Sequence, residues 1–224
     1  PDAGPNEIER LDRAHVFGAW TRQRDYAPRQ VVDAEDCRFR TADGNEYLDF
    51  SSQLVCTNLG YSADHVVEAM AEQARAAPYF RSGYTTEARA RLASKLAEIT
   101  PGDLTKTFFS TGGAVAVEAA IKIARLYTGA EKILSRYRSY HGATLATMEI
   151  TGDPRRLSSP ASGSGAVKAP DAYAYGSTLD PMESLAYIDE ILGHEGGSVA
   201  AVLVEPIVGS SGGVIVPPDE YLPR

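Results

Sequence analysis

Hydrophobic positions alternate near the N-terminus of the chain and follow helical or continuous patterns further along. Between residues 29 and 50, apolar and polar residues alternate as in short strands that bury one face. The turn at residues 42–45, Ala-Asp-Gly-Asn, separates residues 37–39 from residues 46–48 and predicts a hairpin between them. This pattern predicts a small antiparallel unit.

The segment up to about Arg24 is charged and irregular. We expect it to form a loose arm that is anchored by His15, Phe17 and Trp20. Together with the predicted hairpin, it leads us to assign residues 1–60 to an N-terminal arm and a segment of a small α+β domain.

Two amphipathic helices are predicted after this region. The first begins at Ser62 and ends before Pro78, and the second begins at Thr85 or Thr86 and is stopped by Pro101. Each helix has one apolar face, and we expect the apolar face of the second helix to point inward. The apolar positions are Val66, Val67, Met70 and Ala74 in the first helix and Leu92, Leu96 and Ile99 in the second.

The second half of the chain alternates between strands and helices. A helix that is apolar almost all round follows Gly113, and we expect it to be buried. Residues 132–136 and the continuous apolar run at 199–204 predict strands of a parallel sheet, with a helix between them that begins at Asp180. Because strands and helices alternate, the sequence predicts an α/β layer architecture.

Composition restricts the partners of the protein. The 224 residues carry a formal net charge of −8, which argues against nucleic acid or an anionic membrane as a partner, because Lys and Arg hold such partners. We find no signal peptide and no apolar stretch near the ~20 residues that span a bilayer. Cys37 and Cys56 do not make a disulfide framework, so we expect a reducing cytoplasm. The sequence shows no metal-ligand pattern.

The stretch FFSTGGAVAVEAAIKIAR at residues 108–125 places a glycine pair where a strand is predicted to lead into a helix. Gly112 and Gly113 allow a tight turn and a close approach of the backbone to a ligand. The first N–H groups of a helix also attract an anion. The pair therefore indicates either a phosphate site or a simple turn.

Two further candidates follow predicted strands. The residues RSYHG at 138–142 come after the first strand, and Glu205 comes after the later one. The carboxyl ends of parallel strands meet at one edge of a sheet, where α/β proteins bind ligands. We therefore expect the glycine pair, Tyr140 and Glu205 to lie at one edge. Any one of them alone is more typical of packing or of a solvated surface.

Three long segments carry a resemblance to a known family: FFSTGGAVAVEAAIKIARLYTG, SRYRSYHGATLATMEITGDPRR and VAAVLVEPIVGSSGGVIVPP. Shorter matches at residues 43–44, 47–49, 58–60 and 101–103 extend it over nearly the whole chain. The sequence resembles the class III aminotransferases, which use pyridoxal 5′-phosphate on the aspartate-aminotransferase type of fold. SYHGAT, TGDPRR and GVIVPP are most similar to members that act on omega-amino acids, taurine and related amines with pyruvate.

This resemblance implies a central, mostly parallel sheet with helices on both faces. Residues 61–224 would be the N-terminal part of the large cofactor-binding domain. Backbone N–H groups at the turn of Gly112, Gly113 and Ala114 would hold the cofactor phosphate. The ring of Tyr140 would stack on the pyridine ring.

Four more residues receive roles from the same resemblance. His141 would brace the loop and help to form the cofactor site. Glu205 would lie near the cofactor and substrate, where its carboxylate pairs with a mobile arginine or accepts hydrogen bonds within the site. Leu54 and Val55 occupy a stretch that often lines the substrate pocket.

The sequence also departs from the family pattern. Val115 stands where the family carries Glu or Asp, so a polar contact near the cofactor is lost. The family's D-E-x-x-x-G-x-G-R-x-G segment and its Schiff-base lysine are expected downstream, and we expect the chain to be part of a longer protein. None of its five lysines matches the catalytic position: Lys95, Lys106, Lys122, Lys132 and Lys168.

The implied reaction is transamination between an amine or omega-amino acid and a keto acid such as pyruvate, by a homodimer with pyridoxal phosphate. A second interpretation is a truncated or degenerate module that binds phosphate or a partner without chemistry. It is favoured by Val115 and because no lysine of the chain matches the catalytic position. A third is a nucleotide-binding domain, but GGAVAV lacks the GxGxxG spacing.

Overall fold

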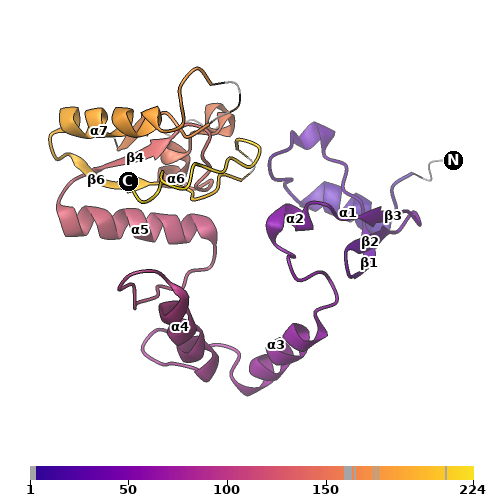
Figure 1. Cartoon of the computed structure of the whole chain (residues 1–224). Helices are drawn as coiled ribbons and strands as arrows, with labels where there is room; N and C mark the ends of the chain where they lie inside the picture. The colour runs from indigo at the N-terminus through magenta and orange to yellow at the C-terminus, as the bar shows by residue number, and fades with distance from the viewer. Residues whose placement is uncertain (1–3, 159–162, 164, 174, 176, 210) are drawn as a thin grey trace. The chain divides into compact units, whose positions relative to one another are not determined.

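A computed structural model describes residues 4–158, 163, 165–173, 175, 177–209 and 211–224. The chain divides into two compact units, Pro1–Asp103 and Leu104–Arg224, which are described separately below (Figure 1). The expected assignment of residues 1–60 and 61–224 to two domains refers to the complete protein and stays a prediction. No helix among the described residues is both long and apolar enough to cross a membrane.

The first unit opens with a helix instead of an irregular arm. Helix α1 (Glu7–His15) begins with a capping box, in which the Asn6 side chain accepts from the Glu9 N–H and the Glu9 carboxylate accepts from the Asn6 N–H, each at 3.0 Å. The expectation of a loose arm is therefore wrong for these residues. Phe17 and Trp20, two of the expected anchors, are largely exposed.

A three-stranded antiparallel sheet follows, in the order β1 (Val31–Glu35), β2 (Arg38–Thr41) and β3 (Glu46–Leu48). The predicted hairpin is thus confirmed as the β2–β3 pair. Phe39 and Tyr47 face each other across this pair with their ring centroids 5.2 Å apart. Such cross-strand pairs stabilise a sheet.

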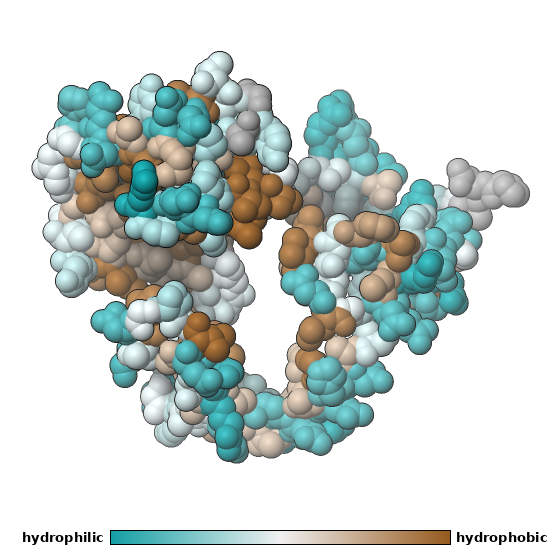
Figure 2. Space-filling model, in the orientation of Figure 1, coloured by the Kyte–Doolittle hydropathy of each residue, from teal (hydrophilic) through white to brown (hydrophobic). Residues whose placement is uncertain are grey.

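Three helices follow the sheet in the first unit: α2 (Ser52–Val55), α3 (Asp64–Ala76) and α4 (Glu87–Ile99). Helix α4 follows Thr86, one of the two predicted starts, and the Thr86 hydroxyl caps the helix by accepting a hydrogen bond from the Arg89 N–H. Several apolar side chains of α3 and α4 are exposed, and for α4 this contradicts the expectation that the apolar face points inward. Those that remain exposed are Val67, Met70, Leu92 and Ile99. Apolar residues are accordingly visible at the surface (Figure 2).

The second unit contains the predicted parallel sheet, in the order β5 (Ala166–Ala169), β4 (Lys132–Arg136) and β6 (Val199–Leu203). Helices α5 (Gly113–Thr128) and α7 (Glu183–Glu195) lie on opposite sides of it (Figure 1). The short helices α6 (Leu145–Ile150) and η2 (Pro154–Leu157) connect β4 to β5. The main hydrophobic cluster is centred on Ile121, Ile133 and Ile150, from α5, β4 and α6.

Two expectations for α5 need correction. The helix is buried along one face only, and its outer face leaves Ile123 and Leu126 exposed, because no described element packs there. The segment before Gly112 is also not a buried strand: residues 104–110 have no assigned strand, and Phe108 is exposed. A strand needs a hydrogen-bonded neighbour, and the described residues provide none for this segment.

Candidate active site at the start of helix α5

Helix α5 begins at the glycine pair with open space in front of it. The first helical hydrogen bond runs from the Ala116 N–H to the Gly112 carbonyl at 3.0 Å, so the N–H groups of Gly113 and Ala114 precede it. No side chain among the described residues caps this end. A Cβ added to Gly112 or Gly113 would meet no described atom within 4 Å.

Neither glycine is required by the fold of the described residues. Gly112 has a φ of 178°, an extended conformation that any residue adopts, and Gly113 occupies the first helical position. With no conformational or packing demand, the small side chain leaves space beside donor N–H groups. The site therefore fits an anion held by backbone.

The loop that carries Tyr140 packs directly on this helix start. A Cβ on Gly142, which has a φ of +135°, would lie 2.7 Å from the Ala114 Cβ and 2.7 Å from Thr147 Oγ1. Only glycine permits so close an approach. Glu118 of α5 also holds the residues that follow Gly142, since its Oε1 accepts a hydrogen bond from Thr144 Oγ1 at 2.6 Å.

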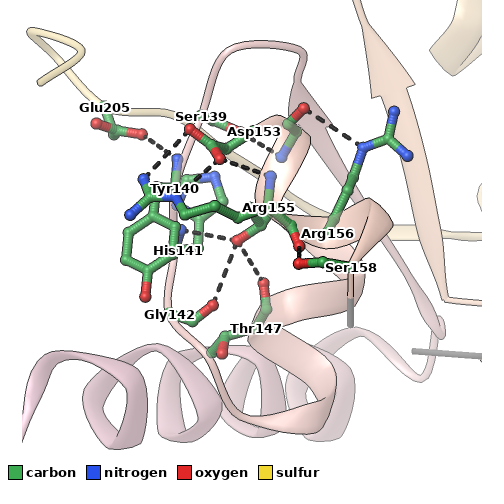
Figure 3. Close-up of polar contacts among 12 residues, drawn as sticks. Ser139, Tyr140, His141, Gly142, Thr147, Asp153, Arg155, Arg156, Ser158 and Glu205 are labelled. Atoms are coloured by element: carbon green, nitrogen blue, oxygen red, sulfur yellow. Dashed lines mark hydrogen bonds and ion pairs between the residues drawn. The ribbon is translucent and has the colours of Figure 1, made fainter. Parts of the chain in front are cut away.

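The carboxylate of Glu205, which follows β6, holds the same loop by binding the backbone of Tyr140. Its Oε1 accepts a hydrogen bond from the Tyr140 N–H at 2.8 Å, and its Oε2 accepts from the Gly209 N–H at 3.3 Å (Figure 3). Arg136, which is only 2% exposed, donates from Nη2 to the Glu205 carbonyl at 2.5 Å. The carboxylate therefore connects the loops after β4 and β6, and both of its oxygens accept hydrogen bonds.

His141, the next residue of this loop, is 8% exposed. Its backbone N–H donates to Thr151 Oγ1 at 3.0 Å, and its Nε2 has no hydrogen-bond partner among the described residues. Burial, together with the positive charges of Lys168 and Arg136, lowers the pKa of His141 to about 4. The imidazole is therefore neutral at physiological pH and well placed to brace the loop.

Within the second unit, the structure thus brings together Gly112, Gly113, Ala114, Tyr140, His141 and Glu205. The glycine turn reaches this place through the contact between Gly142 and Ala114 and not as the end of a strand in the same sheet. Leu54 and Val55 belong to the first unit, where they are 84% and 72% exposed and have positive φ angles of 59° and 67°. Their place in a substrate pocket stays a prediction.

Sequence reasoning gave no individual role to Gly142, Asp153 or Arg155, although each lies in a motif that it quoted. Asp153 caps η2, since its Oδ1 accepts from the Arg155 N–H at 2.8 Å, and Pro154 follows it. An Asp-Pro pair is a recognisable helix-start signal, so this element was open to prediction. The described residues contain no cluster of three or more His, Cys, Asp or Glu side chains that could hold a metal ion.

The fold of the chain is that of the pyridoxal-phosphate-dependent transaminases. The chain matches the solved structure of taurine:2-oxoglutarate aminotransferase from Bifidobacterium kashiwanohense, a complex with pyridoxal phosphate and glutamate, with a TM-score of 0.87 and 38% sequence identity. That match covers 97% of this chain and 51% of the other. The sequence model of the family named aminotransferase class-III matches residues 20–224, and the chain belongs to this family.

Curated relatives in the family differ in the activity that their names state. Taurine–pyruvate aminotransferase of Rhodobacter capsulatus is 35% identical over 98% of this chain and 50% of its own length. Leucine/methionine racemase of Thermococcus litoralis is 36% identical over 97% of this chain and 50% of its own length. The chain spans about half the length of the curated relatives it matches.

Proposed function

We propose that these residues form the phosphate-binding and ring-binding part of a pyridoxal-phosphate-dependent aminotransferase. The enzyme transfers an amino group between an amine or omega-amino acid of the taurine type and a keto acid such as pyruvate. The observation that carries this proposal is the packing of Gly142 on Ala114, which joins an open helix start to the loop of Tyr140.

The donor set of the site suits the cofactor. N–H groups of Gly113 and Ala114 bind the phosphate, with Gly112 and Gly113 leaving the necessary space. The ring of Tyr140 orients the planar pyridine, and Glu205 fixes the backbone that carries this ring. Pyridoxal phosphate, when bound, supplies an electron sink for the reacting carbon. We place the lysine that carries the cofactor outside these 224 residues.

The choice of amino donor rests on the named relatives and on sequence motifs. The taurine–pyruvate and hypotaurine/taurine–pyruvate aminotransferases are 35% and 33% identical to this chain. The similar Bifidobacterium enzyme is named for 2-oxoglutarate, so the keto acid differs among relatives. Pyruvate is our proposal because SYHGAT and TGDPRR resemble the pyruvate-dependent members.

We further propose that the complete protein is a cytoplasmic homodimer. The two cysteines, Cys37 and Cys56, are both free thiols, which suits a reducing compartment. The exposed apolar residues on α3, α4 and the outer face of α5 are of the kind that protein contacts cover.

The test is an assay of the full gene product that contains these residues. Taurine, hypotaurine and β-alanine are offered with pyruvate or 2-oxoglutarate, and the amino acid formed from the keto acid is measured. We expect alanine to form fastest, with taurine and pyruvate. Cofactor binding with no amino transfer to either keto acid, or racemisation of leucine or methionine as the main activity, would overturn the proposal.

A further inference from the structure

The positively charged guanidinium of Arg155 lies over one face of the Tyr140 ring. The guanidinium carbon of Arg155 lies 4.1 Å from the centroid of the ring. This is well within the ~6 Å at which a guanidinium is attracted to the face of an aromatic ring. Figure 3 shows the guanidinium above the phenol ring.

Asp153 fixes the direction of that guanidinium. Its Oδ1 accepts from Arg155 Nε at 2.8 Å and its Oδ2 accepts from Arg155 Nη2 at 3.2 Å, so the pair is bidentate. The backbone N–H groups of Gly152 and Asp153 both donate to the Ser139 carbonyl at 2.9 Å. Arg155 is therefore anchored to the residue that directly precedes Tyr140.

Both members of the pair stay charged near neutral pH. The hydrogen bond from Arg155 lowers the pKa of the Asp153 carboxyl, and the same bond raises the pKa of Arg155, while burial opposes both shifts. Asp153 is buried and Arg155 is half-buried, so solvent screens the pair less than it screens a surface pair. The cation over the ring is thus a constant feature of the site.

We propose that Arg155, held by Asp153, is a positioning residue that fixes the plane of the Tyr140 ring before any ligand binds. The guanidinium takes one face of the ring, and the planar ring of the cofactor stacks on the opposite face. The identity of the ligand rests on the proposed function, whereas the fixed plane of the tyrosine ring does not.

Fixing the plane has two consequences for binding. Immobilising a mobile aromatic side chain costs binding free energy, and Arg155 removes much of this cost in advance. A ring that is covered on one face also admits a planar ligand from one side only, so Arg155 restricts the orientation in which the cofactor enters.

The first experiment measures the ring itself, without ligand. The full gene product is labelled with 3-fluorotyrosine, and the ¹⁹F resonance of Tyr140 is assigned from its absence in Tyr140→Phe. Arg155→Met, which keeps an unbranched apolar stem and removes the guanidinium, should shift and broaden this resonance. Arg156→Met is the matched control, because Arg156 follows in the same short helix and bonds the Gly152 carbonyl at 3.4 Å; it should leave the resonance in place.

A second experiment links the ring to cofactor binding through a double-mutant cycle. Arg155→Met should weaken pyridoxal phosphate binding about three- to tenfold, the range expected for a partly desolvated cation–π contact. In a Tyr140→Leu background the same change should have less than about a twofold effect, since additivity fails only for groups in contact. Arg155→Lys, which keeps the charge without the planar fork, should restore part of the affinity.

Several outcomes would overturn the proposal. These are an unmoved Tyr140 resonance in Arg155→Met, an equal effect of Arg156→Met, or the same loss of affinity with and without the tyrosine ring. If Arg155→Met does not fold, Asp153→Asn removes one acceptor of the fork and keeps the guanidinium, and it should also move the resonance. If the wild-type protein binds no pyridoxal phosphate, the proposed function fails, while the ¹⁹F result still decides the role of Arg155.

Discussion

Replacing Gly113 by valine is the sharpest test of the phosphate site. In a helix the Cα–Cβ bond tilts toward the N-terminus, so a side chain at the first position projects into the space in front of the free N–H groups. The added Cβ meets no described atom within 4 Å, so this space can accept a side chain. Valine is also a slightly better helix former than glycine, which should preserve α5.

The expected loss follows from the contacts that the valine blocks. A hydrogen bond to a charged group contributes roughly 1.5–3 kcal/mol, so losing the bonds from Gly113 and Ala114 costs roughly 3–6 kcal/mol. This corresponds to a weakening of cofactor binding by a factor of about 100 or more. Helical content should stay nearly unchanged.

The assay is equilibrium dialysis of pyridoxal phosphate against the full gene product, with circular dichroism to follow the helices. Gly193→Val is the matched control, because Gly193 lies in α7 and an added Cβ there also meets no described atom within 4 Å. The control should bind the cofactor as the wild type does. Unchanged affinity in Gly113→Val would remove the assignment of the phosphate to this helix start.

Four further predictions concern the same site and the assembly. Tyr140→Ala should weaken cofactor retention by ~1 kcal/mol, about fivefold in a dialysis measurement, and Tyr140→Phe should nearly restore it; equal losses in both would refute ring stacking. Glu205→Gln should weaken binding about tenfold, because an amide offers one acceptor oxygen where the carboxylate holds two N–H groups; wild-type affinity would show that this link does not position the loop. The unfolded chain protonates His141 near its ordinary pKa of about 6.5, whereas the folded protein does so near 4. The free energy of unfolding should therefore fall as the pH decreases through this interval, and His141→Asn should flatten that part of the urea-denaturation profile; an identical profile would count against a buried neutral imidazole. Light scattering of the full gene product should give the mass of a dimer, and a stable, active monomer would contradict the proposed assembly.

Elements whose signals are local could be predicted from the amino-acid sequence alone. The hairpin of β2 and β3 follows from alternation around an Asp-Gly turn, and the Thr86 cap of α4 follows from a residue type at one position. Lys132–Arg136 was predicted with its observed bounds, because short apolar strands next to helices follow a regular pattern. The family motifs likewise lie in continuous stretches, so the class of protein could be inferred without coordinates.

Local patterns gave wrong answers where burial depends on distant partners. The apolar composition of α5 predicts burial all round, yet its outer face is exposed, because composition does not say which neighbours are present. The opposite error concerns the N-terminal segment, which we expected to be irregular and which forms helix α1. A short capping box between Asn6 and Glu9 stabilises α1 without a hydrophobic face that packs in the core.

How the candidate residues meet depends on the packing of elements that are far apart in the sequence. Tyr140 and Glu205 are 65 positions apart in the sequence, and their hydrogen bond exists because β4 and β6 are neighbours in the sheet. The contact of Gly142 with Ala114 and the stacking of Arg155 on Tyr140 depend on how a loop folds back on a helix. Backbone N–H groups, carboxylates and ring faces bind through direction and distance, and the packing of separate elements sets both.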